Sequence, residues 1–201
     1  MEKSVCLRAY DAPPISRKEI LRYAGMPKKT PQISALLDEC LAEISKQLSY
    51  RVCYRELPII LDNGILHLGF ADSDSSDLQK NLFGCSSIIL FAATVGLAPD
   101  RFVARYSPIS PTKALLMQAI GAERIEALCD LFSQEISAEK SLAGFKTRPR
   151  FSPGYGDLSL DLQKSIVLAL DCQRKIGLTL NESLLLTPTK SVTAIIGITR
   201  K

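Results

Sequence analysis

The sequence predicts an α+β fold, in which helices flank an antiparallel or mixed twisted sheet. Segments with helical periodicity and segments with hairpin character are mixed, without the regular alternation that builds a parallel βαβ sheet. An Asn-Gly pair between two apolar runs is the strongest short-range signal of an antiparallel hairpin. The 201 residues show no internal repeat and no linker. We therefore expect residues 1–201 to form a single domain, with 1–80 as its less well defined N-terminal part.

Two helices are predicted in the first fifty residues. Ser16 and Glu19 have the spacing of a capping box, which predicts a short helix that ends before Gly25. Thr30 is suited to cap the next helix, with Pro31 at its first position. The apolar residues of this second helix recur at helical spacing and should face the core; they are Ile33, Leu36, Leu37, Cys40, Leu41, Ile44 and Leu48.

Strand signals begin at Arg51. Two apolar runs flank Asp62-Asn63-Gly64, which indicates two antiparallel strands joined by a tight turn. The Ser- and Asp-rich stretch 72–77 resembles the start of a calcium loop, but the required Gly and terminal Glu are missing, so helix capping is the better interpretation. A short helix should follow and end at Gly84. The apolar run 85–96 has strand length and should lie in the centre of the sheet.

A short and a long helix are predicted next. Pro99 and Asp100 open a helix to about Tyr106, and Ser110 or Thr112 caps a long helix to about Ile136. The long helix should bury one apolar face and expose the other, polar face. Its expected inward residues are Ile125, Leu128, Leu131 and Phe132, and its expected outward residues are Glu123, Asp130 and Gln134.

The C-terminal third should contain one helix and then strands. Ser159 can cap a helix that continues to Gly177, with Asp161 in its first turn and basic residues in its last. The tail is rich in Thr, Val, Ile and Leu and is interrupted at Asn181 and Pro188, which predicts strand, turn and strand.

The composition is that of a globular protein without an export or membrane signal. Apolar residues make up 46% and charged residues 23%, so a packed core is expected. The first residues lack the apolar stretch of a signal peptide. The longest apolar run, 88–93, falls far short of the roughly 20 residues that cross a bilayer. We therefore expect a cytoplasmic protein that does not enter the membrane.

Metal sites and common catalytic sites are not indicated. The six cysteines lie far apart, mostly in apolar patterns, which predicts reduced and buried thiols instead of a disulfide frame, zinc site or iron–sulfur site. His67 is the only histidine, so we expect a structural role for it and no Ser/His/acid arrangement. The G-x-G-x-x-G loop of a Rossmann-type methyltransferase is absent. We predict no catalytic residues and no metal ligands.

A basic stretch followed by a Pro-Gly-Tyr-Gly loop carries the strongest functional signal. If 146–150 is extended, as Pro149 favours, then Lys146, Arg148 and Arg150 should project to one face. The glycines of the following loop permit close backbone approach, and Tyr155 offers an aromatic face with a polar tip. Such a segment suits a small ligand with a carboxylate or phosphate and a flat apolar part.

Two other interpretations of the basic stretch stay open. Alternating cations on an exposed edge strand protect against aggregation, and a Pro-Gly loop before a helix is common; from these residues alone this structural interpretation is favoured. Nucleic-acid binding is disfavoured, because few aromatic residues interleave with the cations and the net charge is only +4.

Two motifs resemble those of one known family. The segment RPRFSPGYGDLSL resembles the R-P-x-P-G-Y signature of the activation domain of cobalamin-dependent methionine synthase. The segment IGLTLNESLLLTPTKSVTAIIGI is similar to the second signature of that family, I-G-x-x-L-T-E-S followed by Pro and then Ser-Val. Both occur in the family's order, with a helix between them. The resemblance covers about Leu82 to Ile198, and it extends to stand-alone versions of the domain in anaerobic bacteria.

The resemblance implies a binding site for S-adenosylmethionine. Arg150 would pair with the ligand carboxylate, with Arg148 in a supporting position, and the acidic residues Glu123 and Glu126 would be available for the ligand's positive groups. Ile196 and Gly197 fall where full-length members carry aromatic contacts, although neither residue can stack. The residues expected to line the ligand are Arg150, Ser152, Pro153, Gly154, Tyr155, Ile196 and Gly197.

The resemblance also implies a function. The chain would be an accessory protein for reductive methylation of the cobalamin of a methionine synthase or related corrinoid protein, with cobalamin carried only by that partner. A flavodoxin or ferredoxin-type reductant would supply the electron, and this chain would contribute positioning alone. The alternatives are a scaffold of the same fold that has lost the ligand, and an anion- or RNA-binding module.

Overall fold

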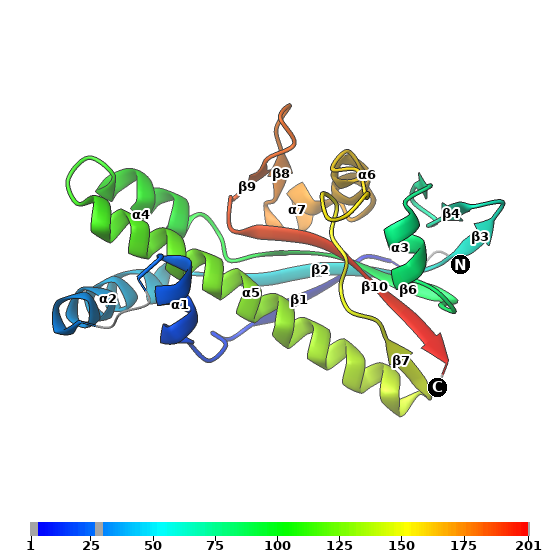
Figure 1. The fold of residues 1–201 in the computed structure, drawn as a ribbon, viewed down its shortest axis with the longest axis horizontal. Helices are drawn as coiled ribbons and strands as arrows, with labels where there is room; N and C mark the ends of the chain where they lie inside the picture. Colours follow the sequence, from blue (N-terminus) through cyan, green and yellow to red (C-terminus); the bar gives the residue numbers. More distant parts are fainter. Residues whose placement is uncertain (1–3, 27–29, 201) are drawn as a thin grey trace.

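A five-stranded antiparallel sheet forms the centre of the protein, in the order β1-β2-β6-β10-β7 (Figure 1). The structure is a computed structural model that describes residues 4–26 and 30–200. Alternate residues of β6 enter the cores on opposite faces of the sheet, which confirms that its apolar run is a central strand. The strands are β1 (Cys6–Tyr10), β2 (Tyr50–Pro58), β6 (Ser87–Thr94), β7 (Phe145–Thr147) and β10 (Ser191–Arg200).

One long helix, α5 (Pro111–Leu142), crosses one face of this sheet (Figure 1). Leu128 and Phe132 of α5 pack against Phe91 of β6 and Ile196 of β10 in one buried cluster. The helix runs past the predicted end near Ile136, because neither Gly nor Pro occurs between Ile136 and Gly144. The fold is therefore α+β, as the sequence predicts.

Three short helices cover the opposite face of the sheet: α3 (Ser76–Asn81), α6 (Leu162–Ala169) and α7 (Cys172–Ile176). The prediction of one helix up to Gly177 is wrong, because the chain breaks at Asp171, which has left-handed backbone angles (φ 47°, ψ 46°). In an unbroken helix Leu170 and Cys172 would point roughly 200° apart. The break lets both side chains enter the same core, where both are fully buried.

A separate helical cluster forms around the first half of α5. It contains α1 (Arg17–Tyr23), α2 (Pro31–Ile44), the 3-10 turn η1 (Ser45–Gln47) and α4 (Ala98–Tyr106). The predicted caps are confirmed: the Ser16 hydroxyl accepts from the amide of Glu19, and the Thr30 hydroxyl accepts from the amide of Ile33. Ser110 lies at the N-cap position of α5, but its side chain caps no amide.

The predicted hairpin is present but small. Asn63 (φ 48°) and Gly64 (φ 80°) both have positive φ, as the tight turn requires, and they join β3 (Ile60–Asp62) to β4 (Ile65–His67). A third strand, β5 (Asp72–Ser73), pairs with β4, and Nδ1 of His67 is hydrogen-bonded to the Asp72 carboxylate at 2.8 Å. Most of the first apolar run belongs instead to β2 of the main sheet. The tail forms β8 (Thr179–Leu180), β9 (Leu186–Thr187) and β10.

Within residues 4–26 and 30–200, no helix combines the length and apolar character needed to cross a membrane.

Candidate ligand-binding site

A cavity of about 380 Å³ lies where the loop after β7 meets the start of β10. Its volume falls in the range of small-ligand sites, roughly 300–1,000 Å³. The structure brings five of the predicted residues together around it: Glu126, Arg150, Ser152, Pro153 and Tyr155. The other lining residues are Phe151, Gln163, Leu186, Ser191, Val192 and Thr193.

Arg150 is the charged centre of this cavity. One guanidinium nitrogen, Nη2, lies 2.5 Å from the Glu126 carboxylate and 3.3 Å from Asp130, one turn further along α5. The other, Nη1, is buried and has no hydrogen-bond partner among the described residues. A buried donor without a partner is costly, so Nη1 is a group that a ligand oxygen would satisfy.

A neutral thiol lies beside Arg150. Burial raises the pKa of Cys129 to about 12, and the positive charge of Arg150 acts in the opposite direction. The thiol therefore does not compete as an anion for the guanidinium. The acidic partners of Arg150 in the structure are the two α5 carboxylates, which are both partly exposed.

The prediction that Lys146, Arg148 and Arg150 share one face is wrong for Arg150. The amide of Arg148 donates to the carbonyl of Gly197, and Phe151 pairs with Ile195. Between these two pairs the chain advances three residues from Arg148 to Phe151 but only two along β10, from Gly197 to Ile195. This extra residue is a β-bulge, which reverses the side to which the next side chain points. The Arg148 side chain therefore bonds to the carbonyl of Phe83 near α3, while Arg150 reaches α5.

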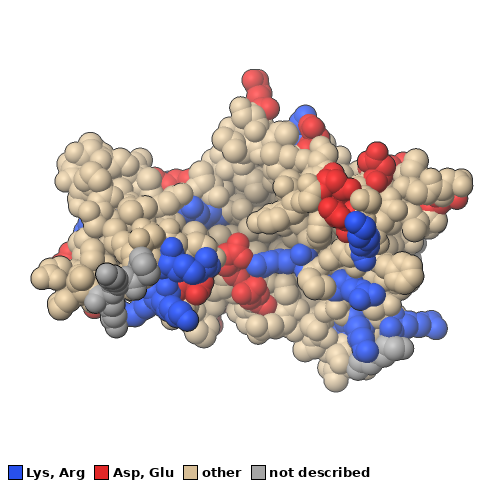
Figure 2. Space-filling view, in the orientation of Figure 1, with Lys and Arg blue, Asp and Glu red and all other residues tan. Residues whose placement is uncertain are grey.

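The three cations Lys146, Arg148 and Arg150 therefore do not form one continuous basic surface. In Figure 2, Lys and Arg side chains gather at the lower right, over the region where Figure 1 shows β7 and the end of β10. Asp and Glu side chains gather beside α3 in the same view. Arg150 is not part of an uninterrupted basic strip, because Glu126 and Asp130 offset its charge.

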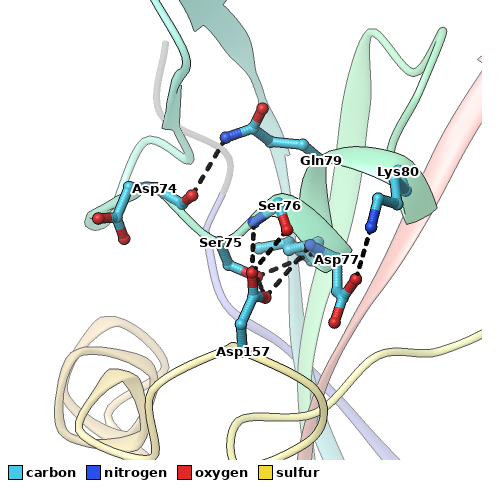
Figure 3. A network of polar contacts seen from close by, with 8 residues as sticks. Asp74, Ser75, Ser76, Asp77, Gln79, Lys80 and Asp157 are labelled. Carbon is cyan, nitrogen blue, oxygen red and sulfur yellow. Dashed lines mark hydrogen bonds and ion pairs between the residues drawn. The ribbon is translucent and has the colours of Figure 1, made fainter.

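The loop that carries Ser152 to Tyr155 is fastened to the start of α3 (Figure 3). The Asp157 carboxylate accepts hydrogen bonds from the hydroxyls of Ser75 and Ser76 and from the amides of Ser76 and Asp77. These bonds, led by the Ser75 hydroxyl, hold the pKa of Asp157 well below its usual range. The stretch 72–77 thus caps α3, as predicted, with a carboxylate from a distant loop as an additional cap.

Sequence reasoning missed the polar floor of the cavity. The Thr193 hydroxyl of β10 donates to the side-chain oxygen of Gln163 at 3.2 Å, and the Gln163 amide donates to the carbonyl of Leu184 at 3.1 Å. Gln163 is a buried polar residue on α6. The sequence signal for it was a polar side chain directly after Leu162, which was expected on the inner face of this helix. The Ser-Val of the second motif marked Ser191 and Val192, the neighbours of Thr193.

Four of the named residues do not line the cavity. Gly154 has φ 88° and shapes the loop, with its amide donating to Leu158. The Arg148 side chain reaches the carbonyl of Phe83 near α3, and the residue borders only a second hollow beside Arg150. Ile196 is 1% exposed in the core and borders the same second hollow, of about 400 Å³. Gly197 contributes to neither hollow, so no wall of the cavity forms at the two positions where the family carries aromatic contacts.

Glu123 is also not at the cavity, and its predicted exposure is wrong. It is 3% exposed and forms a buried ion pair with Arg124, at 2.5 Å. Glu123 also accepts from the amide of Ser16, the donor that Glu19 would satisfy in a complete capping box. This tertiary partner explains why an acidic side chain lies on the inner side of α5. Glu126 is therefore the only one of the two proposed acidic residues beside Arg150.

Enlarging Gly197 is expected to destabilise the protein. A Cβ at Gly197 would lie 2.7 Å from both Cys85 Sγ and Leu82 Cδ2, well inside contact distance. Gly197→Ala should lower the free energy of unfolding by about 1–3 kcal/mol, the usual range for overpacking. Urea denaturation measures this change. Unaltered stability would show that these neighbours shift without strain and that a larger residue could be accommodated here.

Among the described residues, no group of three or more His, Cys, Asp or Glu side chains is arranged to hold a metal ion.

The architecture defines a class of α+β domain, with an antiparallel sheet crossed by one long helix and a ligand-sized cavity at its side. Among solved structures, the protein is similar to a crystal structure of the MetH reactivation domain bound to AdoHcy, with a TM-score of 0.67 and 14% sequence identity. The match covers 98% of this chain and 78% of that one. No protein-family model matches the sequence, and a search of the curated proteins gives no match. The fold agrees with the one that the sequence resemblance implies.

Proposed function

We propose that the protein binds S-adenosylmethionine in the cavity at Arg150 and presents its methyl group to the cobalamin of a partner protein. The observation that carries the proposal is Arg150, which lines the cavity with the Ser152–Tyr155 loop and whose buried Nη1 has no hydrogen-bond partner within residues 4–26 and 30–200. The shared fold supports it, since the similar MetH domain is bound to AdoHcy.

The charges around the cavity suit this ligand. S-adenosylmethionine combines a carboxylate with an ammonium and a sulfonium group, and the cavity offers one guanidinium flanked by Glu126 and Asp130. Arg150 would pair with the carboxylate of the ligand, and Glu126, which lines the cavity, would pair with one of its positive groups. Tyr155 is 70% exposed, so its ring remains available to cover a bound ligand. A simple polyanion would be repelled by the two carboxylates.

The chain itself would act by positioning. It would hold the ligand with its methyl sulfonium accessible at the surface and would require no general acid or base. The cobalamin of the partner, a methionine synthase or related corrinoid protein, would supply the nucleophile for the methyl group, and S-adenosylhomocysteine would leave as the thioether product. A flavodoxin or ferredoxin-type reductant supplies the electron. We place this accessory role in the cytoplasm.

Calorimetric titration of S-adenosylmethionine into the purified protein tests the proposal. Saturable binding is expected, and ATP serves as a control because it shares the adenosine but carries phosphates in place of the amino acid. No binding of S-adenosylmethionine at millimolar concentration would overturn the proposal. Capture of a corrinoid protein without ligand binding would then favour a scaffold. Binding of RNA that weakens steeply with salt would favour an anion-binding module.

A further inference from the structure

We propose that Asp157 is a positioning residue, which fixes the ligand-binding loop by fastening it to α3. The inference rests on the proposed function, since it concerns the loop that lines the proposed ligand site. It assigns a role to the segment 74–83, which mostly precedes the region of clear family resemblance.

The Asp157 carboxylate makes most of the hydrogen bonds between the loop and the start of α3. It lies two residues after Tyr155 and accepts four hydrogen bonds from three consecutive residues, Ser75, Ser76 and Asp77 (Figure 3). Two of the four donors are backbone amides, which can only donate, and they bond to different carboxylate oxygens: Ser76 N–H to Oδ2 and Asp77 N–H to Oδ1. The contact therefore requires an acceptor at both oxygen positions. A neutral amide at position 157 would direct its own N–H groups toward at least some of these donors.

The glycine before Asp157 makes the contact close. Gly156 has φ 55°, and a Cβ built on it would collide with the Asp77 carboxylate. The chain therefore approaches α3 at a distance that only glycine permits without movement of Asp77.

Two further contacts hold the other end of the loop, one to the last residue of α3 and one to Phe83, just beyond its C-cap. The Asn81 side chain donates to the carbonyl of Pro149 at 3.2 Å, and Arg148 donates to the carbonyl of Phe83 at 2.8 Å. Arg150 and the cavity-lining residues Phe151, Ser152, Pro153 and Tyr155 lie between these contacts and Asp157. The loop is thus fastened to α3 on both sides of its ligand-facing part.

The helix α3 is anchored in the core, but none of its residues lines the cavity. Leu78 and Leu82 anchor it in the core, at 0% and 3% exposure, and neither residue lines the cavity. Within the loop, the amide of Gly154 donates to Leu158 and the amide of Tyr155 donates to Ser152. Loss of the fastening should therefore change the position of Ser152 and Tyr155 while the core stays folded, so that affinity changes more than stability.

The test compares Asp157→Asn with Asp161→Asn. Asp161 is a matched control, because it is an exposed carboxylate four residues away whose contacts are with Lys164 and Ser159 and not with α3. We expect Asp157→Asn to weaken S-adenosylmethionine binding at least tenfold and to speed amide hydrogen exchange at Gly154, Tyr155 and Leu158. Asp161→Asn should change neither quantity. The melting temperature, measured in parallel, reports any general loss of fold.

Two more variants separate positioning from a merely structural role. Asp157→Glu keeps the carboxylate and should recover part of the affinity. Ser76→Ala should weaken binding when made alone and add little to Asp157→Asn, because the two residues share a contact. Unchanged affinity and exchange in Asp157→Asn would overturn the inference. If the wild-type protein bound no ligand, the proposed function would fail, and the exchange rates alone would decide whether Asp157 holds the loop.

Discussion

Arg150→Ala is expected to weaken S-adenosylmethionine binding by roughly 30- to 700-fold. This range corresponds to about 2–4 kcal/mol, the typical loss when one partner of a buried, charge-assisted contact is removed. The expectation depends on Arg150, which lines the cavity and whose buried Nη1 has no hydrogen-bond partner in the part of the chain that the structure describes. Calorimetric titration of the variant, beside the wild type, measures the change.

The matched control is Lys146→Ala. Lys146 belongs to the same basic stretch, but it lies opposite Thr199 on the side of the sheet that faces α3. Its removal should change the affinity by less than about twofold, because distant exposed charges are screened by salt. Equal losses in both variants would indicate a general charge effect instead of a site. Full affinity in a folded Arg150→Ala variant would remove Arg150 from the site.

Arg150→Ala should leave the protein folded, which makes the experiment interpretable. The ion pairs of Arg150 with Glu126 and Asp130 are partly exposed, and such pairs contribute about 0–1 kcal/mol. Arg150→Lys should retain only part of the affinity, since an ammonium group cannot reproduce the paired donors of a guanidinium.

The predictions that the structure confirms rest on local patterns in the sequence. The Asn63-Gly64 turn, the caps at Ser16 and Thr30 and the central strand β6 depend on residues that are near each other in the chain. The sequence also singled out Arg150, Ser152, Pro153 and Tyr155, which the structure places around one cavity, because they are close together in a single motif. Their role in binding a ligand stays a prediction.

Long-range geometry explains what the sequence could not show. The bulge after Arg148 is defined by its pairing with β10, which the local sequence does not show. The alternation of side chains along an extended strand therefore placed Arg150 on the same side of the sheet as Arg148, which is wrong. The contact between Ser75 and Asp157 spans 82 residues, and neither local pattern indicates the other. The break at Asp171 follows from packing on the core, which overrides the helical pattern on both sides of it.

Arg124→Met is expected to have the largest effect on stability, a loss of about 3–5 kcal/mol in the free energy of unfolding. Arg124 is 1% exposed, and its side chain is held between Glu123 and the carbonyls of Pro13 and Pro14. Methionine fills similar space but leaves the Glu123 carboxylate buried without its cation, and an uncompensated buried charge has a cost of this order. Urea denaturation measures the loss.

The double variant Glu123→Gln/Arg124→Met distinguishes charge burial from lost packing. Removing both charges should recover part of the stability, because the buried carboxylate is no longer present. The two substitutions should leave S-adenosylmethionine affinity unchanged at temperatures where the variant is folded, since neither residue lines the cavity. A large loss of affinity would restore Glu123 as a candidate for the ligand's positive group. Unchanged affinity would leave Glu126 as the acidic residue of the site, with Glu123 serving to hold the N-terminal segment to α5.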